Sequence, residues 1–181
     1  MLRDLIRHPD YPCAIAESIS VDLEWQAPGL LWLRYHAELD TGQVALPAPA
    51  GPVRQDGLWR TTCFELFVRA PGVPGYSEFN FSPSGAWAAY RFESRRNART
   101  DLALMNPPTI YLEGSDSHIA IETSVRLPEN LTSGFYELGL SAVIEAGDGT
   151  NSYWALAHPT GEPDFHAPDC FALELPSQHA A

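Results

Sequence analysis

Two adjoining segments decide the fold: GLWRTTCFELFVR at residues 57–69 and YSEFNFSPSGAWAAY at residues 76–90. Apolar and polar residues alternate from Thr61 to Arg69 and again from Tyr76 to Phe81, which is the period of a β-strand. A turn that contains proline and glycine then precedes a third run, from Ala86 to Phe92. The segments therefore predict three adjacent antiparallel strands.

The turns determine which side chains share a face of this sheet. If the loop between the first two strands places Arg69 opposite Tyr76, then Glu65 lies opposite Asn80, and Glu78 lies on the same face. We therefore expect one cluster that contains two carboxyl groups and one amide.

The second turn is predicted from its proline. Pro83 cannot adopt the positive φ of a type I′ turn, so we expect a type I turn with Gly85 in the left-handed conformation. This register places Ala88 and Tyr90 beside the polar cluster. It sends three aromatic side chains to the core: Phe79, Phe81 and Trp87.

The polar cluster has two interpretations. The simpler one is a solvated outer face, because most glutamates on strands point into water. The other is a binding site, because Trp59 precedes the first strand and would lie beside the carboxyl groups. Aromatic rings stack on the C–H faces of sugars, and hydroxyl groups need fixed polar partners. We therefore expect a solvent-reachable face that binds a polyhydroxylated small molecule.

Length and charge limit the possible partners. A chain of 181 residues is long enough for one domain with a substantial core, and we predict a single domain over residues 1–181. The formal net charge of −12 disfavours nucleic acid and anionic membranes as partners. No apolar run approaches the roughly 20 residues of a membrane span, and the N-terminus lacks the apolar core of a secretory signal. We expect a cytoplasmic protein.

Four of the eleven basic residues form one run: Arg91, Arg95, Arg96 and Arg99. An exposed loop is the simplest interpretation of this run. The alternative is that it contacts an anionic group.

The cysteines and the composition point away from metals and toward strands. Cys13, Cys63 and Cys170 are odd in number and contain no C-x-x-C pair, so we expect reduced thiols and no bound cofactor. Sixteen prolines and thirteen glycines separate short alternating runs. Beyond the first three, such runs cover residues 19–25, 31–39, 109–113, 118–125, 135–145, 152–157 and 170–175. About ten short strands predict an antiparallel β-sandwich, immunoglobulin-like or jelly-roll-like.

Two loops are expected to complete the site. Residues 40–57 are rich in proline, alanine and glycine and deliver Trp59 to the cluster. The second loop, HPTGEPDFHAP at residues 158–168, contains His158, Asp164 and His166. Each histidine alone is more often a surface residue. Together with the aspartate they could bind a metal or act as a base and an acid, although their spacing matches no defined zinc motif.

Several motifs together resemble the DOMON-like superfamily, which includes the family-nine carbohydrate-binding modules and the haem-binding DOMON domains. The motifs are Trp59, CFELFV at residues 63–68, FNFSPSG at 79–85 and FHAPDCFALEL at 165–175. The resemblance implies a β-sandwich that holds a sugar between two aromatic rings.

On this chain the resemblance makes Trp59 one aromatic wall and Glu65 a hydroxyl acceptor, with Glu78 or Asn80 as its neighbour. The second wall falls near Phe165, where the carbohydrate modules have tryptophan, and phenylalanine stacks on a sugar less well. The haem-binding relatives use a methionine and a histidine as axial ligands. This chain has only Met1 and Met105, and the latter lies in a predicted loop.

The function that we predict is a small-molecule binding module for a sugar or a sugar-like ligand. The binding residues would be Trp59, Glu65, Glu78, Asn80, His158, Asp164, Phe165 and His166. The first alternative is an enzyme that uses the loop from His158 to His166 with the two glutamates, by metal-assisted or acid–base chemistry. The second is a haem-binding DOMON domain.

Overall fold

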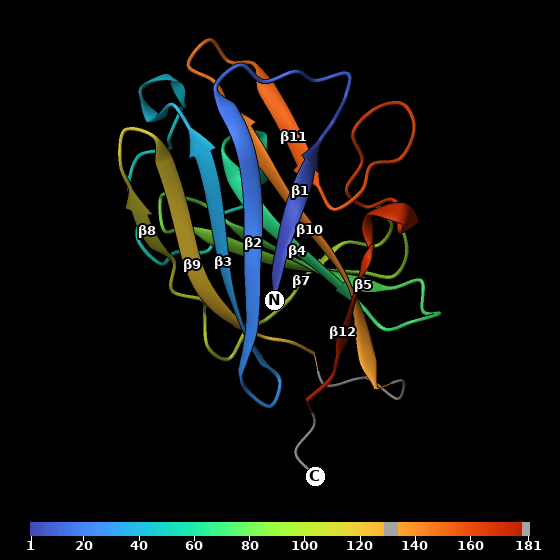
Figure 1. The fold of residues 1–181 in the computed structure, drawn as a ribbon. Helices are drawn as coiled ribbons and strands as arrows, with labels where there is room; N and C mark the ends of the chain where they lie inside the picture. Colours follow the sequence, from blue (N-terminus) through green and yellow to red (C-terminus); the bar gives the residue numbers. More distant parts are fainter. Residues whose placement is uncertain (129–133, 179–181) are drawn as a thin grey trace.

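The chain is an all-β protein without α-helices in the part that the computed structural model describes, residues 1–128 and 134–178. Three short 3₁₀-helices are present: η1 (Thr41–Gln43), η2 (Leu58–Arg60) and η3 (Pro168–Cys170). Figure 1 shows the strands, which are β1 (Leu2–Arg7), β2 (Ala16–Ala27), β3 (Leu30–Leu39), β4 (Cys63–Arg69), β5 (Tyr76–Phe81), β6 (Trp87–Phe92), β7 (Thr100–Asp101), β8 (Tyr111–Gly114), β9 (His118–Arg126), β10 (Phe135–Glu145), β11 (Asn151–Ala155) and β12 (Leu173–Pro176).

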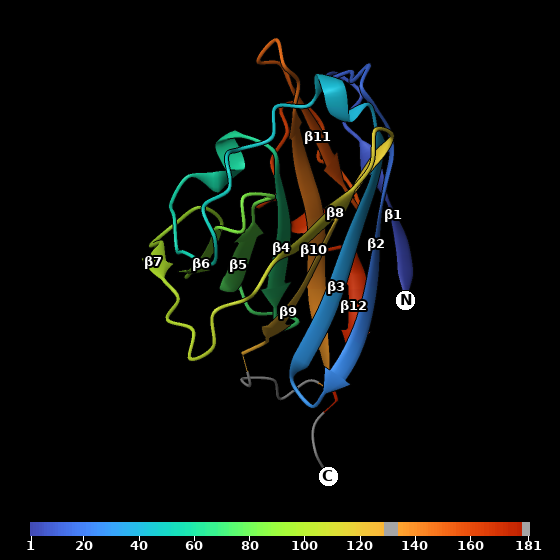
Figure 2. The ribbon, with the colours of Figure 1, turned by 90° about the vertical axis from the view of Figure 1, so that its left-hand side faces the viewer.

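These strands form one curled antiparallel sheet in the order β7-β6-β5-β4-β10-β11-β1-β2-β3-β9-β8, and β12 pairs with β10. The sheet bends so that its two halves face each other, as Figure 2 shows. The all-β antiparallel prediction is confirmed. The prediction of a sandwich of about ten strands is corrected: the twelve strands described are hydrogen-bonded into a single half-barrel rather than two separate sheets.

Strand β1 joins the two halves and was not predicted. Ile6 pairs with Ala155 of β11, and Leu5 pairs with Ile19 of β2. Of the six residues of β1, only Leu5 is buried. A strand with one buried residue has no period-2 pattern, so its sequence gives no strand signal.

The main core lies between the two halves of the sheet. In β3 the predicted alternation is confirmed, because Leu31, Leu33 and Tyr35 are buried and face inward. The Tyr35 ring packs against Phe64 of β4 with ring centroids 5.2 Å apart. Its hydroxyl donates a hydrogen bond of 2.6 Å to the backbone carbonyl of Glu65. This bond crosses the core and ties β3 to the opposite half.

The outer face of the half that contains β4, β5 and β6 is buried as well. A second apolar cluster covers it and includes Phe67 and Tyr90 from the strands, Leu58 from η2 and two residues of the C-terminal loop, Phe165 and Phe171. All the residues of β5 are buried, and in β4 only the last residue is partly exposed. Polar side chains on this face therefore lie beneath loops and not in open solvent.

The predicted register of the central strands is confirmed. Glu65 pairs with Asn80, and Arg69 pairs with Tyr76. Gly85 adopts φ +89°, as the turn prediction requires. A Cβ atom there would also come within 3.2 Å of the Gly51 backbone, so both conformation and space require glycine.

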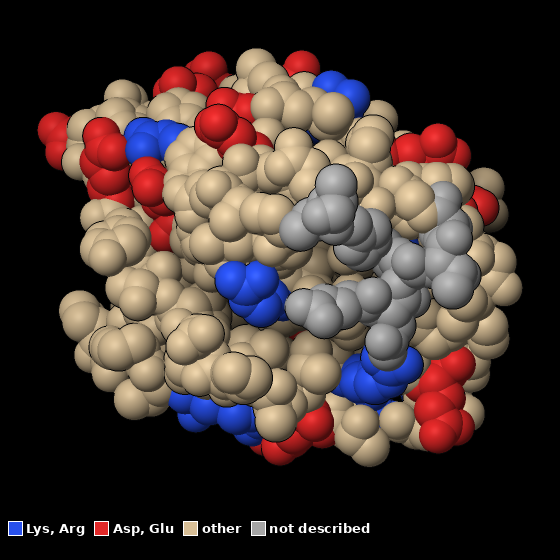
Figure 3. Space-filling model, turned by 90° about the horizontal axis from the view of Figure 1, so that it is seen from below, with Lys and Arg blue, Asp and Glu red and all other residues tan. Residues whose placement is uncertain are grey.

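The surface is predominantly acidic. Figure 3 shows acidic side chains around the edges of the face seen from below, with isolated arginines and wide uncharged areas between them. Among residues 1–128 and 134–178, no helix has the length and apolarity that a membrane span requires.

We predict that Tyr35→Phe destabilises the fold by about 1–2 kcal/mol, because the buried carbonyl of Glu65 loses its cross-core donor. Chemical denaturation measures the free energy of unfolding. The matched control is Tyr111→Phe, which removes the same hydroxyl from a side chain that is 66% exposed and should change stability by less than about 0.5 kcal/mol. Equal effects of the two substitutions would contradict the role of the Tyr35 bond.

Candidate functional site

A cavity of about 600 Å³ opens on the outer face of the β4–β5 half of the sheet, beside η2 and the loops that follow β6 and β11. Its volume is typical of small-molecule sites. Four aromatic residues line it, Trp59, Phe92, Tyr153 and Phe165, together with three arginines, Arg60, Arg96 and Arg99. The remaining lining residues are Glu65, Glu78, Val143, Asn151, Pro163 and His166.

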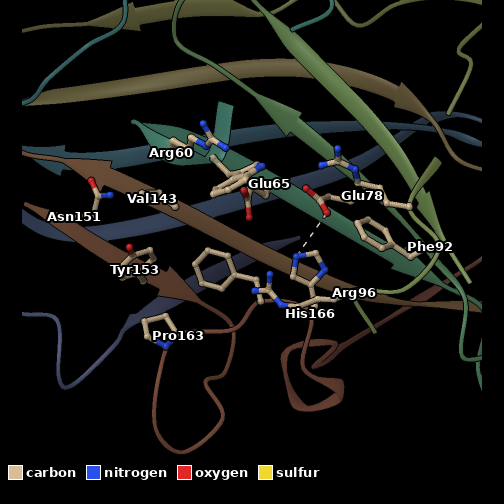
Figure 4. Close-up of a pocket in the computed structure, with 13 residues that line it drawn as sticks. Arg60, Glu65, Glu78, Phe92, Arg96, Val143, Asn151, Tyr153, Pro163 and His166 are labelled. Atoms are coloured by element: carbon tan, nitrogen blue, oxygen red, sulfur yellow. Dashed lines mark ion pairs between the residues drawn. The ribbon is translucent and has the colours of Figure 1, made fainter. Parts of the chain in front are cut away.

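Two carboxyl groups form the floor of the cavity. Glu65 on β4 and Glu78 on β5 are diagonal neighbours on one sheet face, and only 2% and 4% of their surfaces are exposed. Ser141 donates a hydrogen bond of 3.1 Å from Oγ to Glu65 Oε2, and Asn80 donates one of 2.6 Å from Nδ2 to Glu78 Oε1. Figure 4 shows both carboxyl groups pointing into the space that His166 borders.

Burial changes the protonation of this floor. Burial, and then the negative charge of Glu78, raise the pKa of Glu65 above its ordinary value of 4.5. Burial likewise raises the pKa of Glu78. Each carboxyl group therefore holds its proton to a higher pH than an exposed glutamate does. A protonated carboxyl group both donates and accepts hydrogen bonds.

His166 faces the floor as a neutral ring. Burial, and then the positive charge of Arg96, lower the pKa of His166 to about 4. The Tyr76 hydroxyl accepts a hydrogen bond of 3.1 Å from the Arg96 backbone N–H and lies 2.7 Å from His166 Nδ1. The tautomer of the ring decides which of these two groups donates, and the other ring nitrogen, Nε2, lies toward the floor. This atom is 3.9 Å from Glu78 Oε2, the pair marked by the dashed line in Figure 4. The contact is too long for a hydrogen bond and is not an ion pair while the imidazole is neutral.

Trp59 and Phe165 are brought to the same cavity by two loops. Trp59 is the central residue of η2. This short helix begins directly after Gly57, which adopts φ +77°. Its side chain is 42% exposed, so the prediction that Trp59 is not a core residue is confirmed. Phe165 is 9% exposed, and its ring centroid is 6.1 Å from that of Tyr153. The cavity therefore has both exposed and buried aromatic surface.

The loop after β6 contains two residues in an uncommon backbone conformation. Arg96 and Ala98 adopt φ of 55° and 51°, which non-glycine residues rarely do and which costs of order 1–3 kcal/mol each. Arg96 places Nη2 2.9 Å from Asp164 Oδ1, and Arg95 contacts the other oxygen of the same carboxylate. Burial alone would raise the pKa of Asp164, but the hydrogen bonds from Arg95 and then Arg96 outweigh it, and the pKa is lowered.

Five of the eight predicted binding residues line the cavity: Trp59, Glu65, Glu78, Phe165 and His166. Asn80 does not, and the prediction that it is solvent-reachable is wrong. It is 0% exposed and lies beneath the floor, where it donates to Glu78 and accepts a hydrogen bond from Cys63 Sγ over 3.6 Å. It therefore supports a carboxyl group and does not face the cavity.

The metal alternative required His158, Asp164 and His166 to converge, and the structure does not bring them together. His158 Nε2 lies 2.7 Å from the Ile6 carbonyl oxygen, its ring packs edge-on against His8, and it does not line the cavity. Asp164 is engaged by two arginines, as described above. Among the described residues, no group of three or more histidine, cysteine or carboxylate side chains is placed to hold a metal ion.

The predicted haem alternative required a methionine ligand. Met105 is 96% exposed and is not among the lining residues of the cavity. The cavity as described has His166 as its one imidazole and no sulfur ligand opposite it.

Other lining residues were missed by the sequence analysis. Tyr153 and Asn151 are on the same face of β11. Tyr153 lies within the predicted run 152–157 and Asn151 directly precedes it, but the sequence did not indicate that β10 pairs with both β4 and β11. Arg96 and Arg99 were recognised as a run, and its simpler interpretation was an exposed loop. Nothing in the sequence indicated that the loop folds back over the carboxyl groups.

No protein-family model matches this sequence, and no curated protein matches it. The fold is similar to that of a solved structure from Bacteroides uniformis described as "a putative carbohydrate-binding protein", with a TM-score of 0.66 and 14% sequence identity. The alignment covers 94% of this chain and 83% of that chain.

A family 9 carbohydrate-binding module from Caldicellulosiruptor kristjanssonii, solved with glucose and with cellotriose, matches at a TM-score of 0.48 and 11% identity. The alignment with the glucose complex covers 80% of this chain and 69% of the module. At these identities the similarity establishes an all-β fold shared with the Bacteroides uniformis protein.

We predict that Glu65→Gln stabilises the protein increasingly as pH rises from 4.5. The folded-state pKa of Glu65 is raised, so the stability that its proton confers is complete below pH 4.5 and is lost as pH rises through the folded-state pKa. Glutamine resembles the protonated acid and can still accept from Ser141. Above the folded-state pKa, the gain should be at least about 1.4 kcal/mol, the equivalent of one pKa unit.

The measurement is denaturant unfolding across pH. The matched control is Glu17→Gln, which makes the same change at an exposed residue of β2 and should show no growing difference from the wild type. A difference between Glu65→Gln and wild type that stays constant with pH would show that Glu65 is not a buried acid.

Proposed function

We propose that this protein binds a sugar or a sugar-like ring in the cavity between Trp59 and Phe165. The observation that carries the proposal is the pair of buried carboxyl groups on the cavity floor, flanked by aromatic side chains. Sugars bind where an aromatic face meets fixed hydrogen-bonding groups, because one ring presents both C–H surfaces and hydroxyl groups.

The polar groups of the cavity suit hydroxyl groups in particular. A hydroxyl both donates and accepts, and Glu65 and Glu78 can do either, depending on whether each carboxyl group is protonated. Asn151 Oδ1 is a buried acceptor without a hydrogen-bond partner among the described residues. The Asn151 side chain also lines the cavity, and an amide can both donate and accept hydrogen bonds.

The proposal rests on the cavity and not on the fold. At 14% identity, the Bacteroides uniformis structure shares the architecture with this chain but does not identify binding residues. Membership of the DOMON-like superfamily stays a prediction from the sequence motifs.

We predict that Trp59→Ala weakens sugar binding by about tenfold or more while the melting temperature changes little. Loss of a stacking aromatic side chain costs about 1–3 kcal/mol of binding free energy, whereas Trp59 is 42% exposed and contributes little to the core. Calorimetric titration with a panel of mono- and oligosaccharides measures the affinity, and thermal unfolding measures the stability.

The matched control for this experiment is Trp32→Ala. Trp32 is half-buried on the face of β3 that points away from the core, and it does not line the cavity. It should leave sugar affinity unchanged. A large loss of melting temperature in Trp59→Ala, or equal affinity in both variants and wild type, would remove Trp59 from the site.

A second candidate function is acid–base catalysis on the same ligand. The observation that favours it is the buried pair of neighbouring carboxyl groups with raised pKa values beside the neutral ring of His166. Groups with strongly perturbed pKa values in a cavity are characteristic of catalytic sites. Here one glutamate would act as the general acid and the other as the general base.

NMR spectra of the sugar panel, recorded over time with the protein, test this candidate. Catalysis predicts a new product or a faster interconversion of anomers, and a loss of about 100-fold or more in rate for Glu65→Gln. Sugars that bind but remain chemically unchanged would exclude catalysis on those sugars and leave binding as the function.

A further inference from the structure

We propose that the ligand of this cavity carries an acidic group, and that Arg99 and Arg60 bind that group. This inference rests on the proposed sugar-binding function and adds the chemical class of the ligand: an acidic saccharide with a carboxylate, phosphate or sulfate substituent.

The first observation is the charge of the cavity wall. Three of the eleven basic residues of the chain line one cavity, although the chain carries a net charge of −12. The two glutamates of the floor are the only acidic residues among the described lining residues. Both are almost fully buried, and burial favours their neutral forms, so the cavity presents more positive than negative charge.

The second observation is that Arg99 has no carboxylate partner in the part of the chain that the structure describes. Its guanidinium carbon lies 4.8 Å from the centre of the Tyr90 ring. The acidic groups nearby are already paired: Arg54 places Nη2 2.6 Å from Asp101 and 3.0 Å from Asp56. Arg99 is thus held against an aromatic ring at the cavity, and its guanidinium group donates to no other residue that the structure describes.

Arg60 is placed in a comparable way beside Trp59. Both residues belong to η2, and the Arg60 guanidinium carbon lies 5.1 Å from the centre of the Trp59 ring. Arg60 is exposed and has no ion pair with any described residue. The Arg60 guanidinium group thus lies over one face of the Trp59 ring, at the cavity that both residues line.

Arg96 adds positive charge to the same wall, although its guanidinium group is already paired with Asp164. Arg95 and Arg96 share the single carboxylate of Asp164, so two positive charges meet one negative charge. The excess favours an anion nearby, and the low exposure of Asp164, 14% for its side chain, weakens screening by water. Guanidinium groups bind carboxylate and phosphate oxygens through two parallel hydrogen bonds, which water-exposed lysines do less specifically.

The test compares neutral sugars with their acidic derivatives. Glucose, galactose and mannose are titrated calorimetrically beside the corresponding uronates, 6-phosphates and 6-sulfates, at low and high salt. We expect at least one acidic derivative to bind about tenfold more tightly than its neutral parent, since a hydrogen bond to a charged group contributes that much. High salt should reduce this preference, because the guanidinium groups are partly exposed.

Arg99→Gln should reduce the ratio of acidic to neutral affinity by about threefold, which is about half of a tenfold preference on a free-energy scale, and Arg60→Gln/Arg99→Gln should abolish the preference. The matched control is Arg91→Gln, because Arg91 belongs to the same arginine run, is exposed and does not line this cavity. It should leave the ratio unchanged, which separates a local contact from a change in net charge.

Each other outcome overturns a different statement. Equal affinity for neutral and acidic sugars would overturn the acidic-ligand inference and leave sugar binding intact. A preference that survives in the double variant would overturn the assignment to Arg60 and Arg99. Binding of acetate or inorganic phosphate as tightly as the acidic sugars would show an anion site that does not recognise a sugar. Failure of every neutral and acidic sugar to bind would overturn the proposed function together with this inference.

Discussion

The pairing of β4 with β5, with Glu65 directly opposite Asn80, is the constraint on which the cavity depends. Side chains alternate along each strand, so this one register sends Phe64 and Phe79 into the main core and turns both glutamates to the outer face. A shift of one residue would bury the glutamates between the two halves of the sheet and expose the phenylalanines. Burial of Phe64 and Phe79 in the main core therefore fixes the strand register, and this register determines the face on which the glutamates lie.

The glutamates remain buried because their surroundings reduce the cost of burial. A carboxylate without partners in an apolar environment is unstable by several kcal/mol, and a group in that position retains its proton instead. Here Ser141 and Asn80 each donate to one carboxyl group, and protonation removes much of the remaining cost. The floor is thus a pair of acids that the fold tolerates in their neutral form. The positive charges of Arg99 and Arg96 oppose the rise in the pKa of Glu78 but do not cancel the effect of burial.

The parts of the fold that could be predicted from the sequence are those with a local cause. Period-2 alternation identifies β3 to β6, and the proline and glycine of residues 82–85 define their turn, because both effects act between neighbours in the chain. Strand β1 has one buried residue, Leu5, and owes its conformation to β2 and β11. The curled sheet that it closes is therefore not encoded in any single segment.

The candidate site also has a part that could be predicted from the sequence and a part that could not. The shared face of Glu65 and Glu78 followed from strand register, and Trp59 and Phe165 followed from the sequence motifs. That Asn80 is buried and that His158 lies apart could not be predicted, because both depend on where the loops settle on the outer face. The loop from His158 to Phe171 covers this face with apolar side chains. The positions of its polar side chains depend on residues far away in sequence, as the contact of His158 with Ile6 shows.

The Tyr76 hydroxyl explains how these distant segments form one site. It belongs to β5, accepts from the backbone N–H of Arg96 in the loop after β6, and is hydrogen-bonded to Nδ1 of His166 in the C-terminal loop. These two bonds tie the loop at Arg96 and the His166 ring to β5, with Nε2 of the ring on the side of Glu78. Three segments are thus oriented before any ligand arrives, so binding requires little further loss of conformational freedom. A cavity built in this way has Arg96, its imidazole and its acidic floor in fixed relation, and under the proposed function its selectivity would depend on which ligand satisfies all three at once.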